Sequence, residues 1–235
     1  MKSEKLSRAE AGERALAANP TRNVATFSAD QARNYAEEIL GPRTTLDAIL
    51  PNFDRNYRVL QKKLKLAKNI PRIQMPVIEP EDMERFDQRL QSGSLDIFAP
   101  YARGKLPVPP TNLAEGAKWI TLGVQDGDPK DDVIRANWTF LAAMDLLPLQ
   151  SQIWLEKLVG NIAKFGPATP ESPLLKTTVI VSKEGYILDG HHRYGQIMLA
   201  NPKLRIRALH IPLDIDTLLR ISRDYGSAIG HAPKT

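Results

Sequence analysis

The chain has 235 residues, with 32 Lys and Arg against 27 Asp and Glu, a formal net charge of +5 and no cysteine. This length can form one domain, or one domain with an extension. The absence of cysteine excludes disulfides, thiolate nucleophiles and cysteine-ligated zinc. The mild positive charge permits contact with nucleic acid without requiring it. No apolar run approaches about 18 residues and the N-terminus lacks a signal-peptide pattern, so we expect a cytoplasmic protein with no membrane partner.

The first 70 residues are predicted to be helical. Ser7 with Glu10, and Ser28 with Gln31, have the spacing of helix N-terminal capping pairs. The helix that begins after Ser28 is expected to end at Gly41-Pro42.

A third helical stretch over about residues 53–67 is predicted from apolar residues spaced three and four apart. These are Phe53, Tyr57, Leu60, Leu64 and Ala67. The opposite face is basic, with Arg55, Arg58, Lys62, Lys63, Lys65 and Lys68. This face is either a solvated helix surface or a contact for a phosphate backbone.

The middle of the chain has fewer signals. Residues 81–91 are predicted to form a helix, and the proline-rich residues 104–110 are a linker candidate. Residues 126–132 contain four carboxylates, which form either a solvated turn or a site for a hard cation. Residues 139–147 are apolar and fit either a helix or a buried strand.

The stretch from Thr177 to Ala200 carries the clearest pattern. It predicts a strand, a turn at Gly185, a short strand, and a helix that begins after Asp189-Gly190. Glycine followed by a helix N-terminus directs backbone N–H groups and the positive end of the helix dipole at one point. Arg193 can add a bidentate grip on phosphate oxygens. A strand over 204–211 and a helix over 214–223 are expected to follow.

Residues 187–197, with the sequence ILDGHHRYGQI, resemble the signature of the ParB/sulfiredoxin superfamily. Within that superfamily, the motif is similar to the free serine kinases and the ParB-like nuclease domains. The resemblance implies an α+β fold, with a ParB/sulfiredoxin-like nucleotide-binding domain over 138–235 and a mainly helical extension over 1–137. It favours a strand for residues 139–147.

The resemblance also implies a nucleoside triphosphate site for ATP or CTP with Mg²⁺. Gly190, His191, His192 and Arg193 would bind phosphate, and Asp189 would bind the metal or orient a substrate hydroxyl. Asp189, His191 and His192 are therefore the catalytic candidates. The implied activity is nucleotide hydrolysis or phosphoryl transfer to a hydroxyl acceptor.

One departure from the kinase pattern concerns the base. The serine kinases use a Glu in a Pro-x-Glu turn, where this chain has Gln150, and glutamine cannot take a proton. Either Asp189 or Glu156 replaces that base, or the acceptor is not serine, or no transfer occurs. Gln150, Gln152 and Glu156 are the substrate-side candidates.

Three other hypotheses remain open. In the first, the chain is a DNA-binding partition-like module with nucleotide as a switch. In the second, it is a metal-dependent ParB-like nuclease that needs Asp189. In the third, it is a degenerate domain that has kept the fold and lost the chemistry. A homo-oligomer also remains open.

Overall fold

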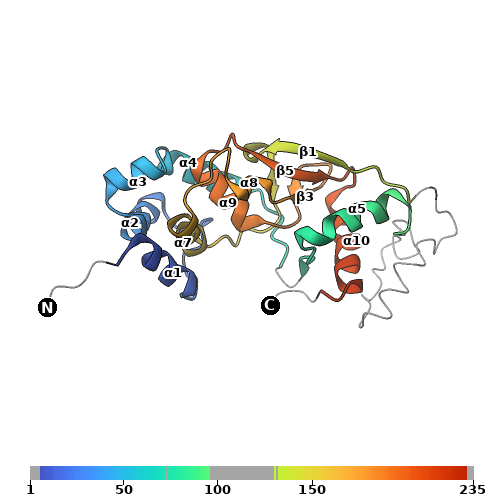
Figure 1. Ribbon diagram of the computed structural model, residues 1–235, viewed down its shortest axis with the longest axis horizontal. Coiled ribbons are helices and arrows are strands. Elements are labelled where there is room, and N and C mark those ends of the chain that lie inside the picture. Colours follow the sequence, from blue (N-terminus) through green and yellow to red (C-terminus); the bar gives the residue numbers. More distant parts are fainter. Residues whose placement is uncertain (1–5, 72–73, 96–129, 131, 232–235) are drawn as a thin grey trace. The chain divides into compact units, whose positions relative to one another are not determined.

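The computed structural model describes residues 6–71, 74–95, 130 and 132–231 (Figure 1). The linker prediction for residues 104–110 lies outside this range. All but two residues of the acidic turn at 126–132 lie outside it as well, and so does the cation site predicted there.

The described chain combines helices with one mixed sheet. In chain order the helices are α1 (Arg8–Ala17), α2 (Ala29–Leu40), α3 (Arg43–Ile49), α4 (Phe53–Leu64), α5 (Met83–Gln91), α7 (Leu155–Phe165), α8 (Pro173–Lys176), α9 (His191–Ala200) and α10 (Ile215–Ala228). Two 3-10 turns are η2 (Pro80–Asp82) and η4 (Ala143–Asp145). The strands are β1 (Asn137–Ala142), β2 (Leu147–Pro148), β3 (Val179–Val181), β4 (Tyr186–Ile187) and β5 (Arg205–His210).

The five strands lie in the order β1-β5-β3-β4-β2. β3 pairs antiparallel with β4 through Val181 and Ile187, and parallel with β5 from Val179↔Ala208 to Val181↔His210. The predicted strand–turn–strand–helix order over 177–200 is confirmed, and Gly185 has the expected positive φ of 89°. The apolar run at 139–147 forms strand β1 up to Ala142 and then turns.

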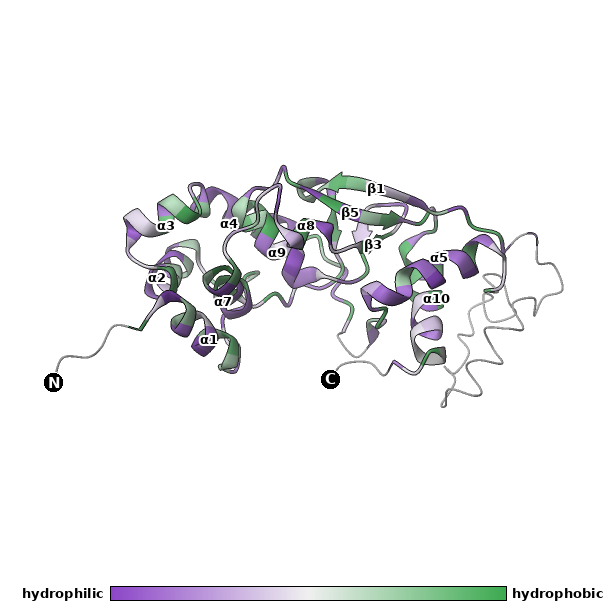
Figure 2. Ribbon diagram, in the orientation of Figure 1, coloured by the Kyte–Doolittle hydropathy of each residue, from purple (hydrophilic) through white to green (hydrophobic). Residues whose placement is uncertain are grey.

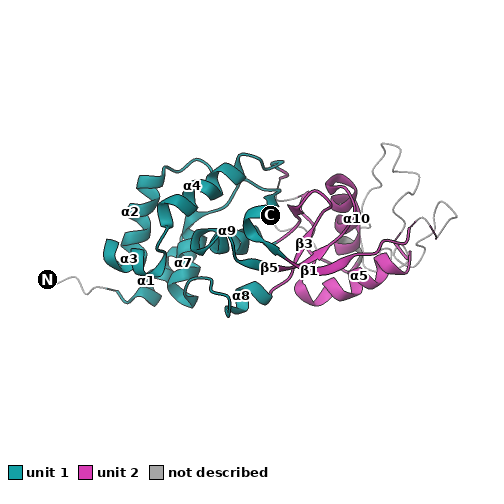
Figure 3. Cartoon of the chain, turned by 90° about the horizontal axis from the view of Figure 1, so that it is seen from above, with its two compact units in different colours: residues 1–69, 141–176, 190–206 teal, residues 70–140, 177–189, 207–235 magenta. Residues whose placement is uncertain are grey.

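Two compact units divide the chain, and Figure 3 colours them separately. Unit 1 contains residues 1–69, 141–176 and 190–206, and unit 2 contains residues 70–140, 177–189 and 207–235. Each unit therefore combines segments from both sides of residue 137. The domain boundary predicted there does not coincide with the division between the units and stays a prediction.

In unit 1, helices α1 and α7 approach closely because glycines face each other. A Cβ on Gly12 would lie 2.7 Å from Ala163 Cβ and 2.9 Å from Gly160 O. A Cβ on Gly160 would lie 2.8 Å from Leu16 Cγ. All three distances are too short for a real Cβ, so the helix contact requires glycine at both positions.

Helix α4 packs against α9 in the same unit. The predicted apolar face is confirmed for Phe53, Tyr57, Leu60 and Leu64, which are at most 1% exposed. The helix ends at Leu64, three residues before the predicted end, and Ala67 is half-buried beyond it. Asn56 Nδ2 donates to two carbonyls at the end of α9, Leu199 O at 2.9 Å and Ala200 O at 3.2 Å. These carbonyls have no partner within a helix, so Asn56 satisfies part of the α9 C-terminus.

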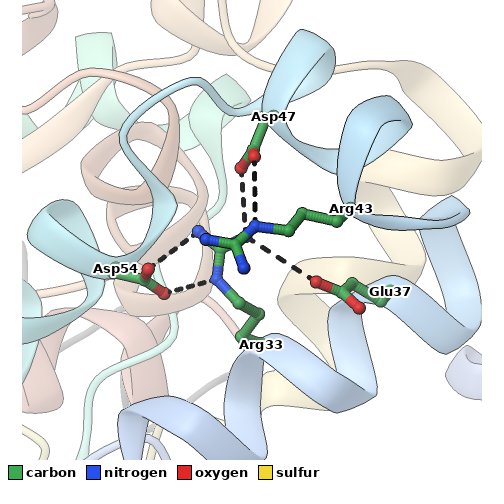
Figure 4. Close-up of polar contacts among 5 residues, drawn as sticks. All are labelled: Arg33, Glu37, Arg43, Asp47 and Asp54. Atoms are coloured by element: carbon green, nitrogen blue, oxygen red, sulfur yellow. Dashed lines mark hydrogen bonds and ion pairs between the residues drawn. The ribbon is translucent and has the colours of Figure 1, made fainter.

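An arginine holds α2, α3 and α4 together (Figure 4). Arg33 Nε and Nη2 each donate to Asp54 at 2.8 Å, and Nη1 donates to Asp47 at 3.0 Å. Glu37 lies 3.7 Å from Arg33 Nη1. The side chain of Arg33 is only 15% exposed, so this bidentate pair is better shielded from solvent than an ordinary surface pair.

In unit 2, α5 and α10 pack through Phe86 and Tyr225, whose ring centroids are 4.8 Å apart. Hydrophobic and hydrophilic residues alternate along helices such as α5 (Figure 2), as expected for helices with one buried face. Trp138 Nε1 donates to Asp87 Oδ2 at 2.8 Å, which ties β1 to α5. Helix α10 continues to Ala228, five residues beyond the predicted end.

Candidate functional site

The predicted anion site lies at the start of α9. Gly190 precedes the helix with φ 88° and ψ 23°, a left-handed conformation that glycine adopts without strain. Tyr194 N–H makes the first helical bond, to Gly190 O at 2.9 Å. The N–H groups of His191, His192 and Arg193 precede that bond, at the positive end of the helix dipole. This geometry is the one that binds phosphate at helix N-termini.

His191 lies inside unit 1 and is only 5% exposed. Its Nε2 accepts hydrogen bonds from Leu149 N–H at 3.0 Å and Gln150 N–H at 3.3 Å. Burial, with a smaller electrostatic contribution from the neighbouring His192, lowers the pKa of His191 to about 3. The ring is therefore neutral near pH 7, with its proton on Nδ1.

These contacts give His191 a positioning role. It holds the turn at Leu149 and Gln150 against the first turn of α9. A neutral ring whose Nε2 already accepts two N–H groups contributes no positive charge to a phosphate. The phosphate-binding and catalytic roles predicted for His191 stay predictions, and this geometry disfavours them.

His192, the next residue, is half-buried and faces the start of α7. Its Nε2 accepts from Trp154 N–H at 3.4 Å, and Trp154 is the residue before α7. Arg193 and Asp189 are also half-buried, and each makes polar or electrostatic interactions. The structure therefore places the start of α9 beside both the turn at 149–150 and Trp154, the residue that precedes α7.

Glu156, predicted on the substrate side, is 1% exposed and fully engaged by the segment before α2. Its Oε1 accepts from Thr21 N–H at 3.0 Å, Arg22 N–H at 3.0 Å and Arg22 Nη1 at 3.1 Å. Burial alone would raise the pKa of Glu156, but hydrogen bonds from Thr21, from its own backbone and from Arg22 keep it below its ordinary value.

This arrangement disfavours one of the open alternatives, in which Glu156 substitutes for the missing base, and that alternative stays a prediction. The carboxylate is ionised, but a substrate hydroxyl would have to displace four hydrogen-bond donors, the three just named and Thr21 Oγ1 at 3.3 Å. The backbone supports the same contact, because Val24 N–H donates to Ile153 O at 2.8 Å and Leu155 N–H donates to Arg22 O at 2.9 Å. Glu156 therefore fixes the segment at 21–24 to the start of α7.

Gln150 and Gln152 differ in their surroundings. Gln150 is partly buried, and its N–H contacts His191, so it lies beside the start of α9, while its substrate-side role stays a prediction. Gln152 is exposed. Sequence reasoning missed Leu149 and Trp154, which act through backbone N–H groups that every residue carries and that leave no signal in the sequence.

A separate groove of about 950 Å³ lies between α1 and α2 in unit 1. Arg22 lies on its wall, where the guanidinium is 4.2 Å from the centroid of the Tyr35 ring and 3.1 Å from Glu156. The residues that line this groove do not include any of residues 189–193. The groove and the start of α9 are therefore distinct features.

Within the part of the chain that the structure describes, no three His, Asp or Glu side chains gather as a metal-binding group. No described helix is long and apolar enough to cross a membrane. No family model, curated protein or solved structure matches this chain. The chemistry of the α9 start therefore has to be argued from its own residues.

Proposed function

We propose that the start of α9 binds the phosphates of a nucleoside triphosphate, ATP or CTP, and that the chain hydrolyses it or transfers its phosphoryl group to a hydroxyl. The observation that carries this proposal is the left-handed Gly190 followed by a helix N-terminus and Arg193. Glycine allows a phosphate to approach the backbone, the amides of 191–193 donate to its oxygens, and the guanidinium adds charge-assisted bonds.

The two histidines have different parts in this proposal. His191 positions the turn at 149–150 beside the phosphate site, as its two N–H contacts indicate. His192 is the imidazole that remains half-buried rather than enclosed. It is therefore the histidine of the pair that we assign to a phosphate oxygen.

Asp189 directly precedes Gly190 and is the remaining candidate for both metal binding and proton transfer. Gln150 cannot take a proton and Glu156 is occupied. A nucleotide-bound Mg²⁺ needs only one or two protein carboxylates, because phosphates and water supply its other ligands, so a single aspartate fits this ion. The ion would neutralise charge on the phosphates.

Isothermal titration calorimetry of the protein with ATP, CTP or GTP, each in the presence of Mg²⁺, tests the proposal. We expect micromolar binding of ATP or CTP by the wild type. Arg193→Ala should weaken it by about 10-fold to 100-fold, since a hydrogen bond to a charged group contributes about 1.5–3 kcal/mol. The matched control is Arg8→Ala, an exposed arginine on α1. No heat with any nucleotide, or equal binding by both variants, would refute the phosphate site.

A second variant separates binding from turnover. Asp189→Asn keeps the shape of the side chain and removes its charge. We expect nucleotide binding to persist and phosphate release, measured as free phosphate over time, to stop. Phosphate release by Asp189→Asn at the wild-type rate would show that Asp189 has no catalytic role.

A further inference from the structure

The outward face of α4 carries four exposed cations in a row. Arg55, Arg58, Lys62 and Lys65 are all exposed, while the opposite face is buried in unit 1. At about 100° per residue, their spacing of three, four and three keeps them within a sector of about 80°. At about 1.5 Å per residue the row is about 15 Å long. Lys65 follows the last helical residue and keeps helical φ and ψ of −68° and −20°. We call these four residues the α4 basic strip.

The charge of this strip is not neutralised by neighbouring acids. Among the described residues, no carboxylate forms an ion pair or hydrogen bond with any of the four side chains. The acidic residue on α4, Asp54, is held by both Nε and Nη2 of Arg33 at 2.8 Å (Figure 4). Four like charges at this spacing repel one another, so the strip has uncompensated positive potential suited to an anionic partner.

The surroundings of the strip identify the kind of partner. A helix that binds a lipid surface has to insert its apolar face, but Phe53, Tyr57, Leu60 and Leu64 on α4 are at most 1% exposed. Proteins that bind single strands stack bases on exposed aromatic rings, and the aromatic residues of α4, Phe53 and Tyr57, are both buried. One exposed apolar side chain, Leu66, follows Lys65 at the end of the strip and is 60% exposed, which is far less than the apolar face of a membrane-binding helix. A row of cations on a helix whose aromatic rings are buried fits the phosphates of a duplex.

We propose that the α4 basic strip binds the phosphate backbone of a nucleic-acid duplex without sequence preference. This surface is independent of the nucleotide proposal, because it uses different residues and a different helix. Four phosphate contacts predict a slope of about −3.6 for the logarithm of the association constant against the logarithm of salt concentration. Affinity should therefore fall about 100-fold between about 50 mM and about 200 mM salt.

Fluorescence anisotropy with a short labelled DNA duplex, without nucleotide, tests this proposal across a salt series. A quadruple variant should lose the salt-dependent binding. It combines Arg55→Gln, Arg58→Gln, Lys62→Gln and Lys65→Gln. Each single substitution should reduce the size of the slope by about 0.9. Thermal melting checks that each variant is folded.

A matched control removes four exposed cations elsewhere: Arg8→Gln, Arg14→Gln, Lys183→Gln and Lys203→Gln. Both quadruple variants carry a net charge of +1, because each loses four from +5. The control should retain binding, which distinguishes the strip from overall charge. Equal loss in both quadruple variants would overturn the proposal.

Competition experiments distinguish the alternative partners. Duplex RNA should compete as well as duplex DNA does, because both present phosphates. Single strands, polyglutamate and anionic vesicles should compete more weakly. If the strip bound any of these three more tightly than the DNA duplex, that ligand class and not a duplex would be its partner. An affinity for duplex that does not depend on salt would overturn the role of phosphate contacts.

Discussion

His191 should make the stability of unit 1 depend on pH, and the structure gives the sign and the size of the effect. Its pKa is about 3 in the folded protein and about 6.5 in an unfolded chain. Between these values the unfolded chain binds more protons, so the free energy of unfolding decreases as pH falls below about 6.5. The loss would be complete near pH 3.

At about pH 5 the two pKa values predict a loss of about 2 kcal/mol relative to about pH 7.5. His191→Gln isolates this contribution, because Gln keeps an acceptor for Leu149 N–H and Gln150 N–H but does not titrate. His191→Leu removes the acceptor as well. It should destabilise the protein at both pH values, by about 1–3 kcal/mol for the unsatisfied N–H groups.

Urea unfolding followed by circular dichroism, at about pH 7.5 and about pH 5, measures these free energies. The difference in stability between wild type and His191→Gln should shift by about 2 kcal/mol in favour of the variant at the lower pH. Other acid-sensitive groups are common to both proteins and cancel in this comparison. An identical pH dependence in the two proteins would refute the buried, neutral state of His191.

Four further substitutions test the packing of unit 1 by thermal melting. Gly12→Ala should destabilise the protein by about 1–3 kcal/mol, because the new Cβ would clash with Ala163. On its own, replacing glycine with alanine stabilises a helix by about 1 kcal/mol. A higher melting temperature would therefore contradict the α1–α7 contact. Glu156→Gln should lower the free energy of unfolding by about 2 kcal/mol, because the donors from Thr21 and Arg22 would then bind a neutral oxygen instead of a charged one. An unchanged melting temperature would contradict the anchoring role of Glu156. Arg33→Met should lower the free energy of unfolding by about 1–2 kcal/mol. Asp54→Asn should lower it less, because it removes only one of the acidic partners of Arg33. Stability equal to that of the wild type in Arg33→Met would contradict a stabilising role for the Arg33–Asp54 pair.

Local signals in the sequence predicted the elements well. Ser7 accepts from Glu10 N–H, and the side chain of Glu10 accepts from Ser7 N–H, which is the capping box expected from their spacing. Ser28 likewise accepts from Gln31 N–H at the start of α2. The positive φ of Gly190 follows from the same type of local rule, since a residue without Cβ was needed before α9. These features depend on residues within about four positions of each other.

Local patterns in the sequence do not show contacts with partners that are distant in the chain. Glu156 binds Thr21, 135 residues earlier, and nothing near Glu156 in the sequence indicates this contact. His191 is buried by a turn more than 40 residues before it. Helix α3 was not predicted because Gly41-Pro42 was interpreted as a stop, whereas proline is also compatible with the beginning of a helix. Tertiary contacts decide the first two cases, whereas the start of α3 depends on a local signal, Pro42, which is compatible with the end of one helix and the beginning of the next.

The interleaved construction of unit 1 has a consequence for its synthesis on the ribosome. Asn56 cannot reach its partner carbonyl until Leu199 has been made, 143 residues later. At about 5–20 residues per second, that interval lasts roughly 7–30 s. Throughout it, the face of α4 that packs on α9 remains without that helix. Nascent chains of this protein should therefore be good substrates for chaperones that recognise apolar surface, and a fragment that stops before residue 141 should lack a cooperative thermal transition.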